Sequence, residues 1–324
     1  MFKNIPYFRD YLPQDLQRVN QVIKEQVRSD VVLIEQIGQY IIGSGGKRLR
    51  PITAILSGRV LGYNDDELYR QAAMIEFIHT STLLHDDVVD ESDKRRGRDT
   101  ANNIFGNAAA VLVGDFLYTR AFQLMVGANS MKLMKVMADA TNVIAAGEVM
   151  QLLNIGNVNL SEEEYLIVIR SKTAKLFEAA AQIGGILANA PQNQEDALKN
   201  YGMYLGVAFQ IVDDVLDYIG DEDSIGKNLG DDLAEGKATL PLIYLMRQGS
   251  DEASMIVRDA LTNAKRENFP LVHKHIIESD AIDYCRVQAK NAVNSAIENL
   301  SVLPDNQYRE TLIELARESI NRLV

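Results

Sequence analysis

Several kinds of residue are scarce in this 324-residue chain, and each scarcity excludes a class of protein. One cysteine, Cys285, cannot form a disulfide framework or a cysteine-based zinc site. The chain has no tryptophan and only 7% aromatic residues, so it has few side chains that could stack on nucleic-acid bases. Acidic residues outnumber basic ones by 45 to 33, and the resulting net charge of −12 argues against nucleic acid as a partner.

Long apolar runs are also missing at the level of the sequence. The first residues, Met1–Pro6, lack the apolar core of a signal peptide. No run approaches the roughly 18 apolar residues that a membrane span requires. With 47% hydrophobic and 24% charged residues, the composition is that of a soluble globular protein. We therefore expect a cytoplasmic protein without a transmembrane segment.

Proline is rare, and its distribution predicts long helices. The chain has seven prolines, and residues 52–190 contain none. Because a proline inside a helix costs about 3 kcal/mol, such a gap favours an all-α protein over a β protein rich in turns. Apolar residues at steps of three and four, such as Leu68, Ala72, Ile75 and Ile78, agree with this.

The helices expected from these patterns fill most of the chain. Ser161 and Glu164 form a capping-box pattern ahead of one of them. No Pro/Gly/Ser-rich linker and no repeat interrupts the sequence, so we predict one helical-bundle domain over residues 1–324. The expected helices are at about 14–42, 51–61, 65–91, 104–126, 130–154, 162–188, 194–219, 238–247, 251–265, 271–278, 281–301 and 306–322.

Two segments with the pattern DDxxD, Asp86–Asp90 and Asp213–Asp217, each end a long apolar helix. Residues four apart share one face of a helix, so the outer two aspartates of each motif project together. This arrangement is unfavourable without a cation, because like charges repel and carboxylates near a helix C-terminus oppose the helix dipole. Mg²⁺ suits such a site, since it takes one or two carboxylates and fills its other positions with water and phosphate oxygens.

Basic residues cluster where a phosphate site would need them. Gly45–Pro51, with the sequence GGKRLRP, places glycines and three cations before a helix start. Arg95–Gly97 follows the first DDxxD motif, and Gly-flanked arginines offer forked donors for phosphate. Further lysines stand at Lys172, Lys227 and Lys237, although any one of them could simply be a surface residue.

His79 has two possible roles on spacing alone. It lies two helical turns before Asp86, where it could donate to a phosphate or be a hydrogen-bonded core histidine. Glu76 and His79 also form an ExxH pattern. A di-iron helical bundle would need this pattern twice, and the chain has no second copy, so we reject that interpretation.

Taken in order, these motifs resemble those of the trans-isoprenyl diphosphate synthases, and most of all the long-chain bacterial polyprenyl type. The resemblance covers nearly the whole chain. Ala238 is a small departure, since relatives often carry proline there. The matching segments are Gly45–Pro51, His79–Asp90, Arg95–Gly97, Lys172–Thr173, Phe209–Asp217 and Gly230–Pro241.

The resemblance implies an all-α fold around a deep central cavity, a homodimer, and a Mg²⁺-dependent reaction with two or three ions bridging a diphosphate to both acidic clusters. An allylic diphosphate ionises, isopentenyl diphosphate attacks the cation, a proton leaves, and the cycle repeats. Preorganised cations would stabilise the leaving diphosphate, and apolar walls would keep water from the carbocation.

Each motif residue takes an expected role from the resemblance. Asp86, Asp90 and Asp213 would be the main Mg²⁺ ligands. The other motif aspartates, which would bind the metal or hold its ligands, are Asp87, Asp214 and Asp217. The residues expected to face the allylic diphosphate are Arg95, Lys172, Thr173, Gln210, Lys227 and Lys237. Those expected to hold isopentenyl diphosphate are Lys47, Arg50, His79 and Arg96.

The product chain is expected to run from Asp86 toward the N-terminal end of its helix, past Thr82, Ser81 and Ile78. Short-chain relatives carry bulky aromatic residues near these positions, whereas Ser81 and Thr82 are small. At 1.5 Å per residue, about 25 residues of helix make a wall of roughly 37 Å, which matches about eight extended isoprene units. We therefore predict a long-chain product, octaprenyl diphosphate, for a quinone side chain.

Three alternatives remain at this stage. The first is a synthase that makes a shorter or longer prenyl product. The second is a terpene cyclase, which has the same fold but usually one clear DDxxD motif and no need for GGKRLRP. The third is an inactive partner subunit of a heteromeric synthase, which typically loses the aspartate motifs that this chain retains.

Overall fold

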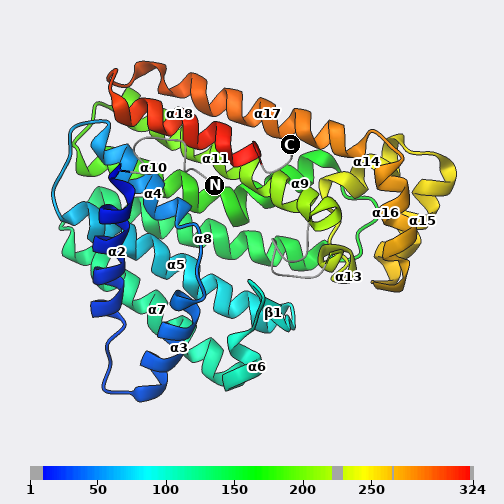
Figure 1. The fold of residues 1–324 in the computed structure, drawn as a ribbon, viewed down its shortest axis with the longest axis horizontal. Helices are drawn as coiled ribbons and strands as arrows, with labels where there is room; N and C mark the ends of the chain where they lie inside the picture. The colour runs from blue at the N-terminus through cyan, green and yellow to red at the C-terminus, as the bar shows by residue number, and fades with distance from the viewer. Residues whose placement is uncertain (1–9, 221–228, 265, 322–324) are drawn as a thin grey trace.

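The computed structural model describes residues 10–220, 229–264 and 266–321, and these are almost entirely helical (Figure 1). The first half contains α2 (Leu12–Gln26), α3 (Val32–Gly43), α4 (Leu49–Arg59), α5 (Glu67–Val89), β1 (Lys94–Arg95), β2 (Arg98–Asp99), α6 (Ala101–Phe105), α7 (Asn107–Gly127) and α8 (Met131–Leu153). The second half contains α9 (Glu162–Ile169), a π-helical turn (Arg170–Ala174), α10 (Lys175–Leu187), α11 (Gln192–Ile219), α13 (Asp231–Ala234), α14 (Leu240–Gln248), α15 (Asp251–Asn263), α16 (Phe269–Ile277), α17 (Ala281–Asn299) and α18 (Gln307–Ile320), with 3₁₀ turns at Arg266–Asn268 and Leu300–Val302.

Helices α5, α10 and α11 form the centre of the bundle. Helix α5 packs most extensively on α7, α10 packs on α4 and α11, and α11 packs on α17. Helices α17 and α18 lie along one long edge, while α2, α3, α6 and α7 lie on the opposite side (Figure 1). Two apolar clusters fill the interior, and α4 and α10 contribute side chains to both, which supports our proposal that residues 1–324 form a single domain.

The predicted all-α class is confirmed, but the expected helix over 14–42 is wrong. Two helices, α2 and α3, cover this range and are separated at residues 27–31. The hydroxyl oxygen of Ser29 accepts a hydrogen bond of 3.1 Å from the Val31 amide, which offers the backbone an alternative to helical pairing. A short antiparallel hairpin at Lys94–Asp99 was also not expected.

The expected helix over 162–188 is interrupted by the π-helical turn at Arg170–Ala174. Its start is as predicted, because Ser161 and Glu164 form a complete capping box. The extra residue in a π turn locally widens the helix, and such turns occur often at functional sites. This one carries Lys172 and Thr173.

Helix α7 corrects our expectation that no segment is apolar enough to span a membrane. By length and composition alone, Asn107–Gly127 meets that criterion, with a mean hydropathy of 1.3 over an 18-residue window. One such helix is weak evidence for a span, because core helices of soluble proteins meet the same criterion. In α7, 39% of the window is buried inside the protein.

Candidate active site

The C-terminal ends of α5 and α11 meet at a cavity of about 800 Å³. Segments that are far apart in the sequence contribute to its wall. The predicted site residues that line it are Lys47, Arg50, His79, Thr82, Asp86, Asp90, Arg95, Arg96, Lys172, Thr173, Gln210, Asp213 and Lys237. Lys227 lies outside the described residues. The cavity therefore brings together most of the residues selected from the sequence.

In the first motif, Asp86 and Asp90 face the cavity, and each has a lysine partner. The Lys172 ammonium lies 3.8 Å from the carboxylate of Asp86. The Lys237 ammonium lies 3.0 Å from that of Asp90. The side chains of both aspartates are about one-fifth exposed, at 20% and 22%. These carboxylates are thus accessible from the cavity and already next to cations.

Asp87, between them, has a different environment. It is fully buried and binds the guanidinium of Arg95, with a distance of 2.7 Å to Nε. Burial raises the pKa of Asp87, and the Arg95 charge opposes that shift. Asp87 therefore holds Arg95 in place beside the motif and does not itself line the cavity.

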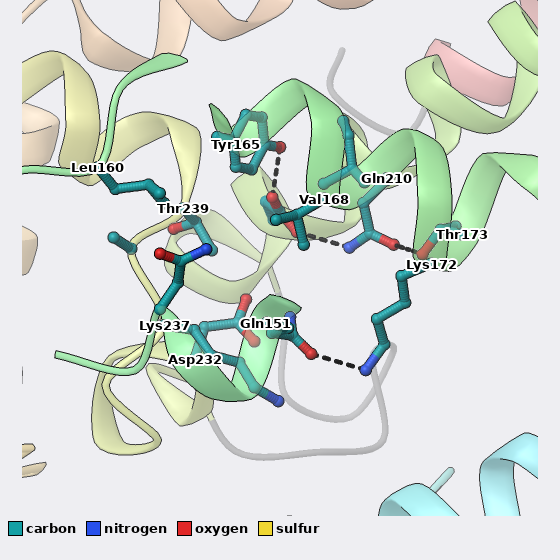
Figure 2. A pocket seen from close by; sticks show the side chains of 14 residues that line it. Gln151, Leu160, Tyr165, Val168, Lys172, Thr173, Gln210, Asp232, Lys237 and Thr239 are labelled. Atoms are coloured by element: carbon teal, nitrogen blue, oxygen red, sulfur yellow. Dashed lines mark hydrogen bonds between the residues drawn. The ribbon is translucent and has the colours of Figure 1, made fainter. Parts of the chain in front are cut away.

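In the second motif, only Asp213 lines the 800 Å³ cavity. Asp214 is buried and accepts hydrogen bonds from the Tyr165 hydroxyl at 2.6 Å and from the Gln210 amide at 2.7 Å (Figure 2). Thr173 in turn donates to the Gln210 carbonyl oxygen at 2.8 Å. Burial raises the pKa of Asp214 to about 8.

Asp217 is also buried, at 1% exposure, and accepts a 3.2 Å hydrogen bond from the Asp232 amide. It thereby connects α11 to the start of α13, which follows it in the chain. Asp214 and Asp217 thus do not line the large cavity, but Asp214 lines a smaller cavity beside it.

The carboxylates that face the cavity suit Mg²⁺. Asp86, Asp90 and Asp213 supply hard oxygen donors from two rigid helices. Within the described residues, no three His, Cys, Asp or Glu side chains lie close enough together to form a complete metal site. Mg²⁺ usually takes one or two carboxylates and completes its sphere with water and substrate phosphate.

The lysines beside these aspartates also bind glutamates that the sequence analysis missed. Glu148 on α8 lies 2.5 Å from the Lys172 ammonium, and Glu235 lies 2.5 Å from that of Lys237. Burial raises the pKa of Glu148 to about 7, with a further increase from Asp86. Burial alone would lower the pKa of Lys237, but Glu235 and Asp90 raise it above its ordinary value. No sequence motif marks Glu148, since it is a single glutamate on a helix that carries other charged residues as well.

On the other side of the cavity, the Gly45–Pro51 loop contacts the hairpin. Arg96 donates to the Gly45 carbonyl oxygen. A side chain at position 46 would place its Cβ 2.7 Å from the Arg96 guanidinium, and Gly46 has a φ of +139°. Arg96 and Gly97 adopt positive φ values of 54° and 74°, as a tight hairpin turn requires. These contacts place the basic residues of both segments at one end of the cavity.

Arg50 and His79 meet at this end. Their nearest nitrogen atoms, Nη1 and Nε2, are 3.3 Å apart. The Arg50 guanidinium also lies over the Phe177 ring, 4.4 Å from its centre. Burial, reinforced by neighbouring arginines, lowers the pKa of His79 well below its ordinary value, so its imidazole is neutral and is a hydrogen-bonding group. This arrangement fits both roles left open by the sequence.

The predicted chain-length residues are placed unequally. Thr82 lines the cavity, whereas Ile78 and Ser81 are each 1% exposed beneath it. The Ser81 hydroxyl donates to the Gly114 carbonyl oxygen on α7 at 2.8 Å. The apolar part of the cavity wall also includes Leu83, Ile144, Leu176 and Phe209. The sequence pattern could not separate these residues from ordinary core residues.

A smaller cavity of about 140 Å³ lies beside the large one (Figure 2). The two share Lys172, Thr173, Gln210, Asp232 and Lys237 in their walls. Leu160, Tyr165, Val168 and Ile169 form much of its remaining lining. It is therefore an extension of the same site behind the two lysines.

Several known proteins are similar to this chain in sequence and in fold. Residues 31–278 match the family described as polyprenyl synthetase. The chain is 52% identical over 309 residues to an octaprenyl diphosphate synthase of Haemophilus influenzae, covering 95% of this chain and 94% of that protein. It is 50% identical over 320 residues to an octaprenyl diphosphate synthase of Escherichia coli K12, covering 98% and 99%.

A solved structure shows the same architecture. The polyprenyl synthase of Caulobacter crescentus CB15, in complex with calcium and isoprenyl diphosphate, superimposes with a TM-score of 0.93 at 42% identity, covering 96% of each chain. Together, the match over most of the sequence and these full-length similarities show that the chain belongs to the polyprenyl synthetase family.

Proposed function

We propose that this chain is a Mg²⁺-dependent prenyltransferase that adds isopentenyl diphosphate repeatedly to an allylic diphosphate, such as farnesyl diphosphate, and makes octaprenyl diphosphate. The observation that best supports this proposal is that Asp86, Asp90 and Asp213 line the same cavity as two groups of basic side chains. The similarity to octaprenyl diphosphate synthases supports the product class.

The allylic diphosphate is assigned to the half of the cavity next to the acidic motifs. Lys172 and Lys237 already contact the first motif there, and Thr173 and Gln210 are joined by a hydrogen bond. Arg95 stands on the hairpin and is held by Asp87. We include Lys227 in this group from its motif alone, since it lies outside the described residues.

The metal would be held by Asp86, Asp90 and Asp213, and we propose two or three Mg²⁺ ions. When bound, Mg²⁺ neutralises the negative charge that develops on the leaving diphosphate. The lysines and Arg95 add fixed positive charge to the same group. The apolar wall at Thr82, together with Ile144, Leu176 and Phe209, keeps water from the allylic carbocation.

Isopentenyl diphosphate is assigned to the other half, with Lys47, Arg50, His79 and Arg96 as its diphosphate ligands. Its double bond then faces the allylic carbon. The allylic carbon–oxygen bond breaks, a carbon–carbon bond forms, and the proton lost from the isopentenyl unit passes to the released diphosphate. No protein nucleophile is required.

Product analysis tests this proposal. We expect the purified protein, given radiolabelled isopentenyl diphosphate, farnesyl diphosphate and Mg²⁺, to yield octaprenol as the main product after dephosphorylation. A main product of farnesol or geranylgeraniol would establish the short-chain alternative. Cyclic hydrocarbons would indicate a terpene cyclase. Failure to turn over alone, but activity with a second subunit, would indicate a heteromeric synthase.

We further propose that the protein is a homodimer formed through α7 and α8. Both helices expose large apolar side chains: Val111 and Leu112 on α7, and Val149, Leu152 and Leu153 on α8. Leu112 and Leu153 are 67% and 78% exposed. Burial of such side chains against a second copy would remove a large apolar surface from water.

Sedimentation analysis of a double variant tests the dimer. Leu112→Glu with Leu153→Glu is expected to sediment as a monomer, whereas Met255→Glu on α15, also at an exposed apolar position, should leave the dimer intact. A monomeric wild-type protein would contradict the proposal.

We also propose that the enzyme acts in the cytoplasm and that its product supplies a quinone side chain.

A further inference from the structure

The ExxH pattern on α5 consists of Glu76 and His79, and of the two only Glu76 has no role in the reaction as described so far. Glu76 is 4% exposed, although an isolated carboxylate is costly to bury. Its carboxylate binds the guanidinium of Arg48, and only 10% of the Arg48 side chain and 5% of the Glu76 side chain are exposed. The pattern therefore marks a buried ion pair between α5 and the basic loop.

Arg48 stands at a demanding position in that loop. It is the residue just before α4, with a φ of 51° in the left-handed region, which non-glycine residues adopt at a cost. Its guanidinium also donates to the Ile42 carbonyl oxygen of α3 at 2.9 Å. Two contacts, one to Glu76 on α5 and one to Ile42 on α3, thus hold the loop in a conformation that its backbone would otherwise disfavour.

The neighbours of Arg48 on both sides are proposed diphosphate ligands. Lys47 precedes it and Arg50 follows two residues later, and both line the cavity. One turn along α5, His79 lies against Arg50, so the two residues of the ExxH pattern contact the two arginines of GGKRLRP. Burial lowers the pKa of Arg50 to about 10, and the Glu76 charge opposes that shift.

We propose that Glu76 is a positioning residue for isopentenyl diphosphate: by holding Arg48 against α5, it directs the other basic side chains of the Gly45–Pro51 loop toward the cavity. This inference rests on the proposed assignment of isopentenyl diphosphate to that loop. Glu76 and Arg48 both lie in the cavity wall, and the role proposed for Glu76 acts through its ion pair with Arg48.

Removal of the Glu76 carboxylate has two opposite effects on the affinity for diphosphate, so a binding measurement can distinguish them. Loss of a negative charge beside several arginines raises the positive potential, which by itself would tighten diphosphate binding. Loss of the Arg48 partner releases the strained loop and misplaces its ligands, which weakens binding. The inference requires the second effect to exceed the first.

The test is Glu76→Gln in the full-length protein, which keeps the shape and removes the charge. We expect the KM for isopentenyl diphosphate to rise about tenfold, while the KM for farnesyl diphosphate changes less than about threefold. Calorimetric titration with isopentenyl diphosphate alone should show the same loss of affinity. Tighter binding, or equal loss for both substrates, would overturn the inference.

Two controls separate the possible failures. Glu195→Gln removes another buried glutamate, 1% exposed and paired with Lys132 away from the large cavity, so it should lower the unfolding temperature without changing either KM. Lys47→Ala tests the assignment of the loop itself. If Lys47→Ala raises the KM for isopentenyl diphosphate and Glu76→Gln does not, Glu76 has no positioning role. If neither does, the assignment of the loop is wrong.

If Glu76→Gln fails to fold, the double variant Arg48→Gln with Glu76→Gln provides the measurement. It replaces the ion pair by two neutral side chains that can still hydrogen-bond. We expect it to recover part of the affinity for isopentenyl diphosphate relative to Arg48→Gln alone. Affinity no better than that of Arg48→Gln would contradict the coupling between the two residues.

Discussion

At the scale of single residues, burial separates the aspartates of the two DDxxD motifs. Asp86, Asp90 and Asp213 line the large cavity, whereas Asp87, Asp214 and Asp217 are buried beneath it. The buried three are bound by Arg95, by Tyr165 with Gln210, and by the Asp232 amide. One motif thus supplies both the groups that face the cavity and the groups that support it.

Asp86→Ala is expected to abolish turnover, because it removes a proposed metal ligand that lies 3.8 Å from the Lys172 ammonium. We expect the variant to retain less than about a tenth of the wild-type rate, measured with radiolabelled isopentenyl diphosphate at saturating Mg²⁺. Asp139→Ala on α8 is the control, since the Asp139 side chain is 66% exposed and lies on the surface. A rate well above that level in Asp86→Ala would disprove the metal assignment.

Tyr165→Phe tests the support of Asp214. The change removes a buried hydroxyl that donates a hydrogen bond to Asp214 at 2.6 Å. The buried carboxyl of Asp214 therefore loses one of its hydrogen-bond partners. We expect the free energy of unfolding to fall by about 1–3 kcal/mol, measured by urea denaturation. Tyr284→Phe, which loses a hydrogen bond to Glu162 where the side chain is only half-buried, should cost less. Equal losses would show that Asp214 does not depend on Tyr165.

At the scale of elements, the π-helical turn places Lys172 and Thr173 in the cavity wall. Helix α8 approaches this turn closely at Gly147, where an added Cβ would lie 2.8 Å from the Lys172 amide nitrogen and 2.9 Å from the Ser171 Cβ. These are backbone and near-backbone atoms that cannot rotate away. The close approach therefore holds the turn at a defined position relative to α8.

Gly147→Ala is expected to displace the π turn and weaken allylic diphosphate binding more than isopentenyl diphosphate binding. We expect the KM for farnesyl diphosphate to rise several-fold and the protein to lose about 1–3 kcal/mol of stability. Gly127→Ala on α7 is the matched control, because no atom lies within 4 Å of its added Cβ. The prediction is wrong if both glycine variants behave alike.

At the scale of the whole molecule, α5 connects the acidic motif to the interior of the bundle. It contains 23 residues, which corresponds to about 34 Å at 1.5 Å per residue. Along it and at its C-cap lie Asp86 and Asp90 of the proposed metal site, Thr82 in the cavity wall, and Ser81 and Ile78 beneath. A product chain that follows this helix would pass these positions in that order.

Thr82→Phe and Ser81→Phe are both expected to shorten the main product, measured by chromatography of the dephosphorylated prenols. The phenylalanine at position 82 would stand directly in the cavity. At position 81 it would replace a buried side chain bonded to α7, so this variant should also lose about 1–3 kcal/mol of stability. Thr262→Phe, at an exposed position on α15, is the control. An unchanged product in both variants would argue against this path.

The sequence by itself determined the helical class, the start of α9 and the identity of the charged cavity residues that belong to its motifs. These features depend on local rules: proline positions, the capping box at Ser161, and the spacing of residues on one helix face. The two DDxxD motifs and the basic segments then identified the charged residues of the site without any knowledge of their neighbours in space.

Only the tertiary structure decided which motif residues face the cavity, where helices break, and what Glu76 and Glu148 contact. Each of these depends on elements that are distant in the sequence: α5 against the Gly45–Pro51 loop, and α8 against the π turn. The spacing of residues in one helix predicts the direction in which each side chain points from the axis of that helix. Burial and ion pairing come from the neighbouring helices, and these determine which of two identical aspartates faces the cavity.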